Sequence, residues 1–335
     1  MDSTNPQLML RQMLTGYWIS QAVYVAAKLD LAEFVAVGPR SADELANVAR
    51  VDARSLYRLL RTLASVGVFR EDAEGRFEQT ELSECLRSSS PHSQRAVAIM
   101  MGEEHYQAWG ELLAGVRTGK CPFEIVYNQN IFDYLAERPE QAKIFDAAMT
   151  GIHGRESQAM LDVYDFSDVG LLADIGGGNG SLLAAMLQRH PGMRGLLFDL
   201  GHVAERSRRA FEAAGVAQRV RVESGSFFDS VPPDADVYLL RHIIHDWDDE
   251  RARKILVNCR AAMPATGRLL LVESVLPPGN DPSFGKLLDL TMLVVPGGIE
   301  RTEKEYRELL RTARFELTRV VPTPAEVAIV EARPL

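Results

Sequence analysis

The sequence is poor in cysteine and has no long uninterrupted apolar run. Its three cysteines, Cys85, Cys121 and Cys259, are scattered and form no CxxC pair. This pattern disfavours a disulfide framework or a zinc cluster and is typical of a reducing compartment. No stretch approaches the ~18 apolar residues of a membrane span, and the first ten residues lack the basic segment of a secretory signal. We therefore expect a cytoplasmic protein with neither a metal site nor a membrane partner.

An excess of positive charge is also missing. The formal net charge is −9, and the first 100 residues are nearly balanced, with 11 basic and 12 acidic side chains. Nucleic-acid binders instead concentrate positive charge against the phosphates, so we expect no nucleic-acid partner. What is present is ordinary globular composition, with 46% hydrophobic residues in a 335-residue chain, long enough for two domains.

The first 95 residues predict a winged-helix-like module. Apolar positions recur at helical spacing over 7–37, which predicts one helix. A capping box at 41–44 and a cap at Asp52 predict two further helices, and strands at 67–69 and 76–77 would then form a hairpin. Winged helices often bind DNA, and that interpretation stays open, but the near-neutral charge favours the apolar first helix as a dimer surface.

The pattern of apolar residues changes twice in the rest of the chain. Residues 92–165 are mostly helical in pattern and rich in methionine and aromatic residues. From Leu171 onward, short apolar runs alternate with amphipathic stretches, which is the pattern of a parallel α/β sheet. A capped helix at 302–312 precedes the last two strands. The predicted strands are 171–175, 195–198, 219–223, 236–240, 268–273, 315–321 and 326–331.

A glycine-rich turn follows the first strand of this predicted sheet. A P-loop would require a lysine that is absent, and a dinucleotide fingerprint would meet Ser181 where its third glycine belongs. The turn fits Asp-x-Gly-x-Gly-x-Gly, the pattern of S-adenosylmethionine (SAM) methyltransferases, with Asp174 first and Gly180 last. Asp199 ends the second strand, where a carboxylate can accept hydrogen bonds from ribose hydroxyls.

With these residues in view, the chain resembles the small-molecule O-methyltransferases of the plant caffeic acid and isoflavone type and their bacterial secondary-metabolism relatives, including phenazine methyltransferases. Four stretches carry the resemblance: ADIGGGNG (173–180), LLRHIIHDWDDE (239–250), LVESVLP (271–277) and GGIERTEKEY (297–306). It implies an α/β fold, with a Rossmann-like SAM-binding sheet preceded by a mainly helical winged-helix dimerisation domain. The implied parts are a homodimerisation domain (1–95), a helical substrate-binding region (96–165) and a catalytic domain (166–335).

The same resemblance implies a SAM site. Its residues would be Asp174, Gly176, Gly178, Asp199, Gly225, Ser226, Phe227 and Arg241. The sequence departs from the family at Ser226, where an aspartate is usual. A hydroxyl still forms hydrogen bonds but carries no charge, so this departure bears on adenine binding.

The implied catalytic residues are His245 as general base and Glu273 and Glu300 as flanking carboxylates. They follow strand ends or precede the capped helix, so they can meet at the rim of the sheet that carries the glycine turn. A neutral imidazole can take the proton of a phenol as its oxygen attacks, and we expect at most one glutamate to bond the ring directly. The implied substrate-pocket residues are Phe145, Met149, Ile152, Asp246, Met292 and Leu293.

Several functions compete. The favoured one is transfer of a methyl group from SAM to a hydroxyl of an aromatic small molecule. The first alternative is N-methylation of an aromatic heterocycle such as a phenazine, which would need no base because a neutral ring nitrogen has no proton to lose. A SAM-responsive winged-helix DNA-binding regulator and an NAD dehydrogenase are further alternatives. The acids at 246–250 could suggest a metal, but acids that open a helix usually cap it.

Overall fold

The structure is a computed structural model that describes residues 5–335. It divides into two compact units. The first extends to Gly110 and includes Phe132–Gly154, and the second combines Glu111–Ile131 with Arg155–Leu335. Residues 96–165, expected to form a substrate-binding region, therefore contribute to both units. Across the described part of the chain, no helix has the length and apolar character needed to cross a membrane.

The N-terminal segment forms three helices and not the single helix predicted over 7–37. They are α1 (Pro6–Leu14), α2 (Gly16–Lys28) and α3 (Leu31–Val35). The first break lies at Thr15, whose hydroxyl bonds the Arg11 carbonyl at 2.9 Å, next to a glycine, a weak helix former. At the second break Asp30 adopts a left-handed conformation with φ 53°, and its carboxylate accepts from Arg95 Nε at 2.7 Å. Apolar periodicity runs through both breaks, so it did not reveal them.

The predicted winged helix is present. Its helices α4 (Ala42–Ala49) and α5 (Ala53–Ser65) are capped by Ser41 and Asp52 as expected. The small sheet has the order β1 (Arg40–Ser41), β3 (Arg76–Glu78), β2 (Arg70–Glu71). The prediction for the first hairpin strand, 67–69, was wrong. Gly67 has φ 83° and the Val68 N–H donates to the Leu63 carbonyl, so this part of the chain forms the turn that closes the end of α5.

The remaining helices of the first unit are short except for the last. They are α6 (Glu81–Glu84), α7 (Arg95–Gly102), α8 (Glu104–Gly110), α11 (Ile131–Ala136, whose first residue belongs to the second unit) and α12 (Pro139–His153). The core of this unit is formed by buried side chains of α2 to α5, the hairpin and α7.

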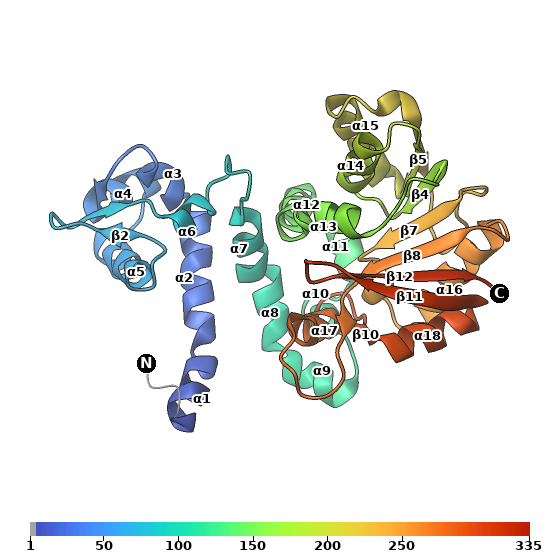
Figure 1. The fold of residues 1–335 in the computed structure, drawn as a ribbon. Helices are drawn as coiled ribbons and strands as arrows, with labels where there is room; N and C mark the ends of the chain where they lie inside the picture. The colour runs from blue at the N-terminus through green and yellow to red at the C-terminus, as the bar shows by residue number, and fades with distance from the viewer. Residues whose placement is uncertain (1–4) are drawn as a thin grey trace. The chain divides into compact units, whose positions relative to one another are not determined.

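A seven-stranded sheet dominates the second unit (Figure 1). Its order is β11-β12-β8-β7-β4-β5-β6. The five strands from β6 to β8 are parallel, and β12 and β11 are antiparallel at one edge. All seven were predicted within a few residues. Their bounds are β4 (Leu171–Ile175), β5 (Arg194–Asp199), β6 (Val220–Ser224), β7 (Val237–Arg241), β8 (Arg268–Glu273), β11 (Phe315–Pro322) and β12 (Ala328–Pro334).

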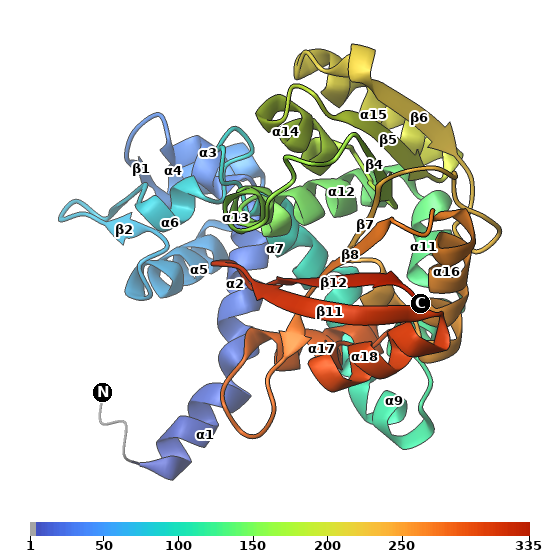
Figure 2. The same cartoon turned by 45° about the vertical axis from the view of Figure 1, so that its right-hand side comes forward.

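Helices cover both faces of this sheet (Figure 2). On one face, α16 (Asp249–Ala262) and α18 (Glu303–Thr312) bury apolar side chains against β7, β8 and β12. On the other, α13 (Glu156–Val163), α14 (Ser181–Arg189) and α15 (Gly201–Ala213) do the same. Burial on both faces explains why the central strands are almost continuously apolar. The unit also contains α9 (Leu112–Thr118), α10 (Pro122–Tyr127), α17 (Phe284–Val294) and two 3₁₀ turns, η1 (Ala217–Arg219) and η2 (Ile244–Asp246).

A separate pair of very short parallel strands lies outside the main sheet. β9 (Val275–Leu276) pairs with β10 (Arg301–Thr302). This pairing was not predicted, because two-residue strands carry no alternating pattern. It joins the chain just after β8 to the start of α18 and so brings residues 273 and 300 into one region.

Candidate functional site

The glycine-rich turn connects β4 to α14 at the carboxyl edge of the parallel strands. Gly176, Gly178 and Gly180 all have positive φ, between 59° and 77°. A Cβ added at Gly178 would meet no heavy atom within 4 Å, so the bare backbone of the turn has open space beside it. A ligand can therefore approach the main chain closely there, which is what such glycines permit.

Two aspartates flank this turn. Asp199 at the end of β5 accepts from the Gly178 N–H at 2.8 Å and from the Leu200 N–H at 2.7 Å. Asp174 is fully buried, and its Oδ2 has no hydrogen-bond partner among the described residues. Burial raises the pKa of Asp174 to about 7, although the charge of Arg241 opposes the rise. The turn thus combines an open backbone with a buried acid that retains an unused oxygen.

The third part of the predicted SAM site follows β6. Ser226 Oγ accepts from the Phe228 N–H at 3.2 Å, so the residue that departs from the family closes a local turn. Phe227 and Phe228 both pack edge-on against Trp247, with ring centroids 6.2 and 4.8 Å away. Gly225 touches the Phe198 ring so closely that a Cβ would overlap it. These residues lie at the same strand-end rim as the glycine turn.

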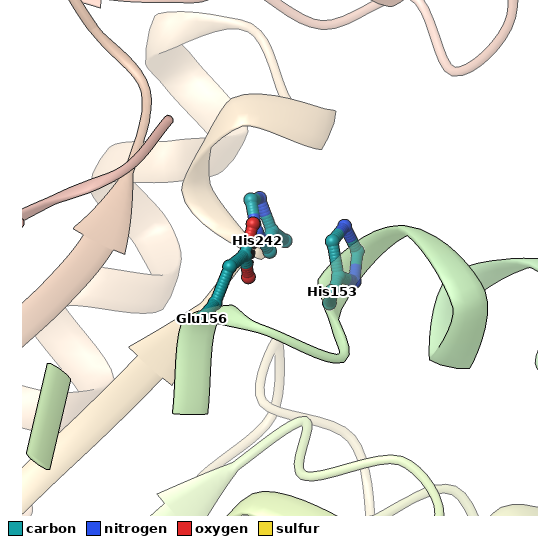
Figure 3. A group of neighbouring side chains, drawn as sticks. All are labelled: His153, Glu156 and His242. Carbon is teal, nitrogen blue, oxygen red and sulfur yellow. Dashed lines mark hydrogen bonds and ion pairs between the residues drawn. The ribbon is translucent and has the colours of Figure 1, made fainter. Parts of the chain in front are cut away.

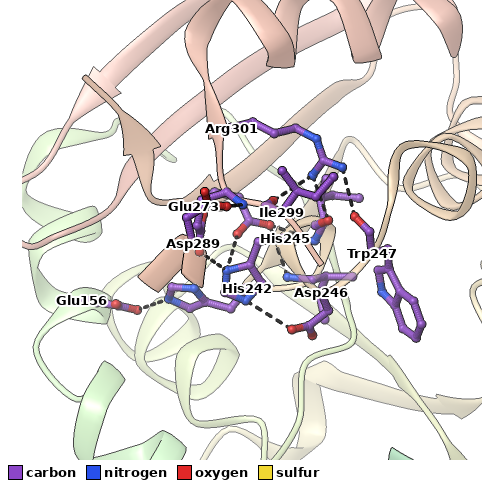
Figure 4. Close-up of polar contacts among 12 residues, drawn as sticks. Glu156, His242, His245, Asp246, Trp247, Glu273, Asp289, Ile299 and Arg301 are labelled. Carbon is purple, nitrogen blue, oxygen red and sulfur yellow. Dashed lines mark hydrogen bonds and ion pairs between the residues drawn. The ribbon is translucent and has the colours of Figure 1, made fainter. Parts of the chain in front are cut away.

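His245 is buried in η2, directly after β7, and its ring is held by carboxylates (Figure 4). Its Nδ1 lies 2.6 Å from Glu300 Oε1 and 3.5 Å from Glu273 Oε2. Glu273 instead accepts from the backbone N–H groups of Ile243 and Ile244, at 3.2 and 2.9 Å. Glu300 hydrogen-bonds the ring directly and Glu273 does not, in keeping with the expectation that at most one glutamate would.

The surrounding carboxylates determine the protonation of this ring. Burial alone lowers the pKa of the imidazole, but the charges of Glu273 and Asp246, with the hydrogen bond to Glu300, raise it to about 10. Burial raises the pKa of Glu273, and it raises that of Asp246 to about 6; the charge of His245 opposes both rises. The raised pKa favours the form of the ring with a proton on each nitrogen. Its Nε2 proton must leave before the ring can accept another.

A second segment, 298–301, holds the backbone around His245. The Ile299 N–H donates to the His245 carbonyl at 2.8 Å. Arg301 is fully buried, and its guanidinium donates to the carbonyls of Ile244 at 3.2 Å and Trp247 at 3.0 Å. It also pairs with Asp249 at 2.8 Å.

The close approach of this segment requires a glycine. A Cβ at Gly298 would overlap the His245 carbonyl oxygen, so any larger residue would push the two segments apart. Asp289, on α17, accepts from the Glu300 N–H at 2.9 Å and so fixes the backbone that carries Glu300.

Three further residues lie close to His245 in the chain. His242, three positions before it, is buried and bonded through Nε2 to Glu156 Oε2 at 2.9 Å (Figure 3). Asp246 Oδ1 lies 3.5 Å from His245 Nε2, on the opposite side of the ring from Glu300. Asp248 caps α16 by accepting from the Arg251 N–H, as expected for an acid that opens a helix.

The predicted substrate-pocket residues fall in different units. Met292 is buried on α17, and its carbonyl accepts from the N–H groups of Gly297 and Gly298, so α17 is tied to the segment beneath the base. Leu293 follows it on the same helix. Phe145, Met149 and Ile152 lie on α12 of the first unit, and their role stays a prediction.

Reasoning from the sequence missed Arg301, Gly298, Asp289 and Glu156. The stretch 297–306 pointed toward the first two, because an arginine and a glycine pair stand beside the predicted Glu300. Whether an arginine is buried cannot be inferred from a single sequence, since most arginines are exposed. Asp289 and Glu156 lie in helices far along the chain and gave no signal.

Comparison with known proteins identifies the family of this chain. Residues 109–316 match the O-methyltransferase domain and residues 11–89 the O-methyltransferase dimerisation domain. The chain is 48% identical to the phenazine O-methyltransferase PhzM of Lysobacter antibioticus, over 97% of this chain and 96% of that protein. The chain therefore belongs to the O-methyltransferase family.

Solved structures of relatives share the fold. The crystal structure of LaPhzM superposes with a TM-score of 0.96 at 47% identity, covering 99% of this chain and all of that one. A second relative is NcsB1, an O-methyltransferase from neocarzinostatin biosynthesis, solved with SAM and 2-hydroxy-5-methyl naphthoic acid. It has a TM-score of 0.85 at 34% identity, with 95% of this chain and 96% of that chain covered.

Proposed function

We propose that the protein transfers a methyl group from SAM to a hydroxyl group of an aromatic small molecule, with His245 as general base. The cofactor is S-adenosylmethionine, and the compounds that the enzyme methylates are aromatic. The observation that carries the finer proposal is the 2.6 Å bond between His245 Nδ1 and Glu300 Oε1. This bond holds a proton on Nδ1 and leaves Nε2 as the atom that can accept the acceptor's proton.

The residues present fit this cofactor. The open backbone at Gly178 offers room for a ligand against the main chain, and Asp199 stands at the strand end where a carboxylate binds ribose. When bound, SAM supplies an electrophilic methyl group on a positively charged sulfur. Asp174, Gly225, Ser226, Phe227 and Arg241 complete the proposed site around it.

The proposed proton path involves only residues of this chain. His245 first gives its Nε2 proton to bulk water, because the positive charge of a cofactor bound at the same rim would oppose the imidazolium and lower its pKa. Nε2 then takes the proton of the acceptor hydroxyl as the oxygen attacks, and the imidazolium that forms is stabilised by Glu300 and Glu273. Asp246, beside Nε2, is placed to accept a second hydrogen bond from the acceptor.

A homodimer through the N-terminal domain is part of the proposal. α1 has no buried residue, and its large apolar side chains face solvent together with those that begin α2. They are Leu8, Met9, Leu10, Met13, Leu14, Tyr17, Trp18 and Ile19. A patch of this kind usually marks a protein interface, and the match to a dimerisation domain supports a second copy as its partner.

The test is a screen with methyl-labelled SAM against matched aromatic acceptors. The panel pairs phenols, catechols, hydroxynaphthoates and hydroxyphenazines with the same rings carrying only a basic ring nitrogen. Label transfer to oxygen, located by mass spectrometry, supports the proposal. Transfer only to nitrogen would replace it with N-methylation. SAM binding by calorimetry without any turnover, combined with retention of duplex DNA in a low-salt gel shift, would favour a regulator.

A further inference from the structure

The bond between Glu156 and His242 lies next to the base but takes no part in the proton path. We propose that this pair is a positioning device, in which Glu156 holds the His242 ring and the ring keeps His245 against Glu300. The proposal rests on the proposed role of His245 as base. It assigns a function to two residues that lie outside the SAM site and do not touch the reacting atoms.

The first argument is the backbone at His242. It has φ 54°, a left-handed conformation that is strained for a non-glycine residue and persists only where its surroundings enforce it. Here the His242 N–H donates to the Val272 carbonyl at 3.1 Å, and the ring is fixed by Glu156. This sharp turn ends β7 and directs Ile243 and Ile244 toward Glu273.

The second argument is the packing of the two histidine rings. Their centroids lie 5.1 Å apart at an interplanar angle of 40°, so the His242 ring forms one wall of the space that His245 occupies. Burial, followed by the charges of His245 and Arg241, holds the pKa of His242 well below its usual range. The ring is therefore neutral, and its Nε2–H donates to the Glu156 carboxylate.

The third argument is the position of Glu156 in the chain. It is the first residue of α13 and follows directly the point where the chain enters the second unit. Arg241 Nη1 donates to the neighbouring Ser157 at 3.3 Å and lies 3.9 Å from the Glu156 carboxylate. The start of α13 is thus joined to the end of β7 by two consecutive residues on each side. Both attachments lie within three or four positions of the base.

A variant with glycine at position 242 tests the contribution of the ring separately from that of the turn. Glycine adopts the left-handed conformation freely, so His242→Gly keeps the turn and removes only the ring and its bond. We expect its kcat to fall roughly 10- to 100-fold, because small misplacements of a catalytic group cost up to about 10²-fold. Its affinity for SAM should stay within about twofold of wild type, since the glycine turn and Asp199 are untouched.

A conservative substitution at position 156 should preserve activity. The amide oxygen of Glu156→Gln can accept the same bond from Nε2–H, so this variant should retain kcat, whereas Glu156→Ala should lose as much as His242→Gly. Tyr164→Phe is the matched control. It deletes another buried bond of the same unit, the 2.7 Å bond to Glu331, which lies away from the base. It should lower the melting temperature without changing kcat.

The deciding measurement does not depend on turnover. A short Nδ1–H···O bond places its proton far downfield in the NMR spectrum, so the His245–Glu300 bond can be observed directly and assigned by its loss in His245→Ala. This resonance should persist in wild type, Glu156→Gln and Tyr164→Phe, and weaken or vanish in His242→Gly and Glu156→Ala. Activity is measured with the panel acceptor that is turned over fastest.

An unchanged resonance in His242→Gly and Glu156→Ala would overturn the proposal. So would equal losses in Glu156→Gln and Glu156→Ala, or a Tyr164→Phe control as impaired as His242→Gly. If His245→Ala remains active while the resonance responds as expected, the proposed base role fails and the positioning of the ring stands.

Discussion

Glu300 Oε1 lies 2.6 Å from Nδ1 of His245, although 55 positions separate the two residues in the chain. The bond exists because β9 and β10 pair and because Gly298 lets the two segments touch. Glu273 Oε2 lies 3.5 Å from the same nitrogen, and Glu273 Oε1 accepts hydrogen bonds from two backbone N–H groups. The two glutamates therefore have different tasks: one orients the ring, and the other fixes the turn that carries it.

Replacing the base should affect turnover and leave cofactor binding intact. We expect His245→Ala to cut kcat by roughly 10²–10⁴-fold, the usual worth of a general base. Higher pH should restore part of the loss, because hydroxide ionises a phenol without help. Asp199→Ala should show the reverse pattern, with a loss of roughly 1.5–3 kcal/mol in SAM binding. Near-normal turnover of His245→Ala at neutral pH would exclude this residue as the base.

Variants of Glu300 and Glu273 should distinguish what each residue contributes to the orientation and the pKa of His245. Glu300→Gln can still accept from Nδ1–H and should cost less than Glu300→Ala, which leaves the ring unoriented. Either Glu300→Gln or Glu273→Gln removes a negative charge near the imidazolium and so lowers the pKa of His245. The acid limb of the pH–kcat profile should therefore move to lower pH in both. A limb that stays in place would show that neither charge governs the base.

Cofactor charge should control the protonation of His245. The pKa of this ring is raised to about 10, and a sulfonium at the same rim should lower it by like-charge repulsion. S-adenosylhomocysteine is the matched control, because it lacks only the methyl group and the positive charge. NMR titration of His245 should show a lower pKa with SAM than with S-adenosylhomocysteine. Equal pKa values with the two ligands would show that the charge on the sulfur does not affect His245.

Asp174 should make stability depend on pH. Its pKa is raised from 3.8 to about 7 in the folded chain, so between these values the folded state binds more protons than the unfolded state. The free energy of unfolding then falls as pH rises through this window. Asp174→Asn stays neutral, so it should melt like wild type near pH 4 and at higher temperature than wild type at pH 8. Calorimetry without cofactor checks this prediction. A difference in melting temperature between Asp174→Asn and wild type that is the same at pH 4 and pH 8 contradicts it.

The proposed dimer should depend on α1. Met13 and Leu14 are 72% and 66% exposed, so glutamates at both positions should not disturb the fold of one copy. We expect light scattering to report a dimer for wild type and a monomer for the Met13→Glu, Leu14→Glu double variant. Leu335→Glu, which changes an equally exposed apolar residue of the second unit, should remain dimeric. A wild-type monomer at micromolar concentration contradicts the proposal.

The sequence predicted the sheet well because each central strand is buried on both faces. Runs such as 268–273 and 236–240 are apolar for that reason, and the glycine turn and capping boxes are local patterns. The helix breaks at Thr15 and Asp30 were missed, because side-chain bonds interrupt a pattern that remains apolar across them. The first hairpin strand was misplaced for a similar reason, since Gly67 ends a helix there.

For the site, the sequence supplied the ring and both glutamates, but only through resemblance to a family. It could not assign which glutamate touches the ring, because that depends on a two-residue strand pair without any periodic signal. Nor could it show that Arg301 is buried or that Glu156 meets His242. The role of Arg301 follows from burial and from contacts with backbone carbonyls. That of Glu156 follows from a bond to a ring far along the chain, and neither leaves a pattern in the sequence.

Most bonds around the base end on main-chain atoms. Arg301 binds the carbonyls of Ile244 and Trp247, and the Ile299 N–H binds that of His245. A main-chain bond survives a change of side chain, and the side chain of Ile299 is 38% exposed. Evolution, or a protein engineer, can therefore reshape the surface beside the base by substitution at such positions. New acceptors could be explored in this way while the proposed proton removal by His245 is inherited unchanged.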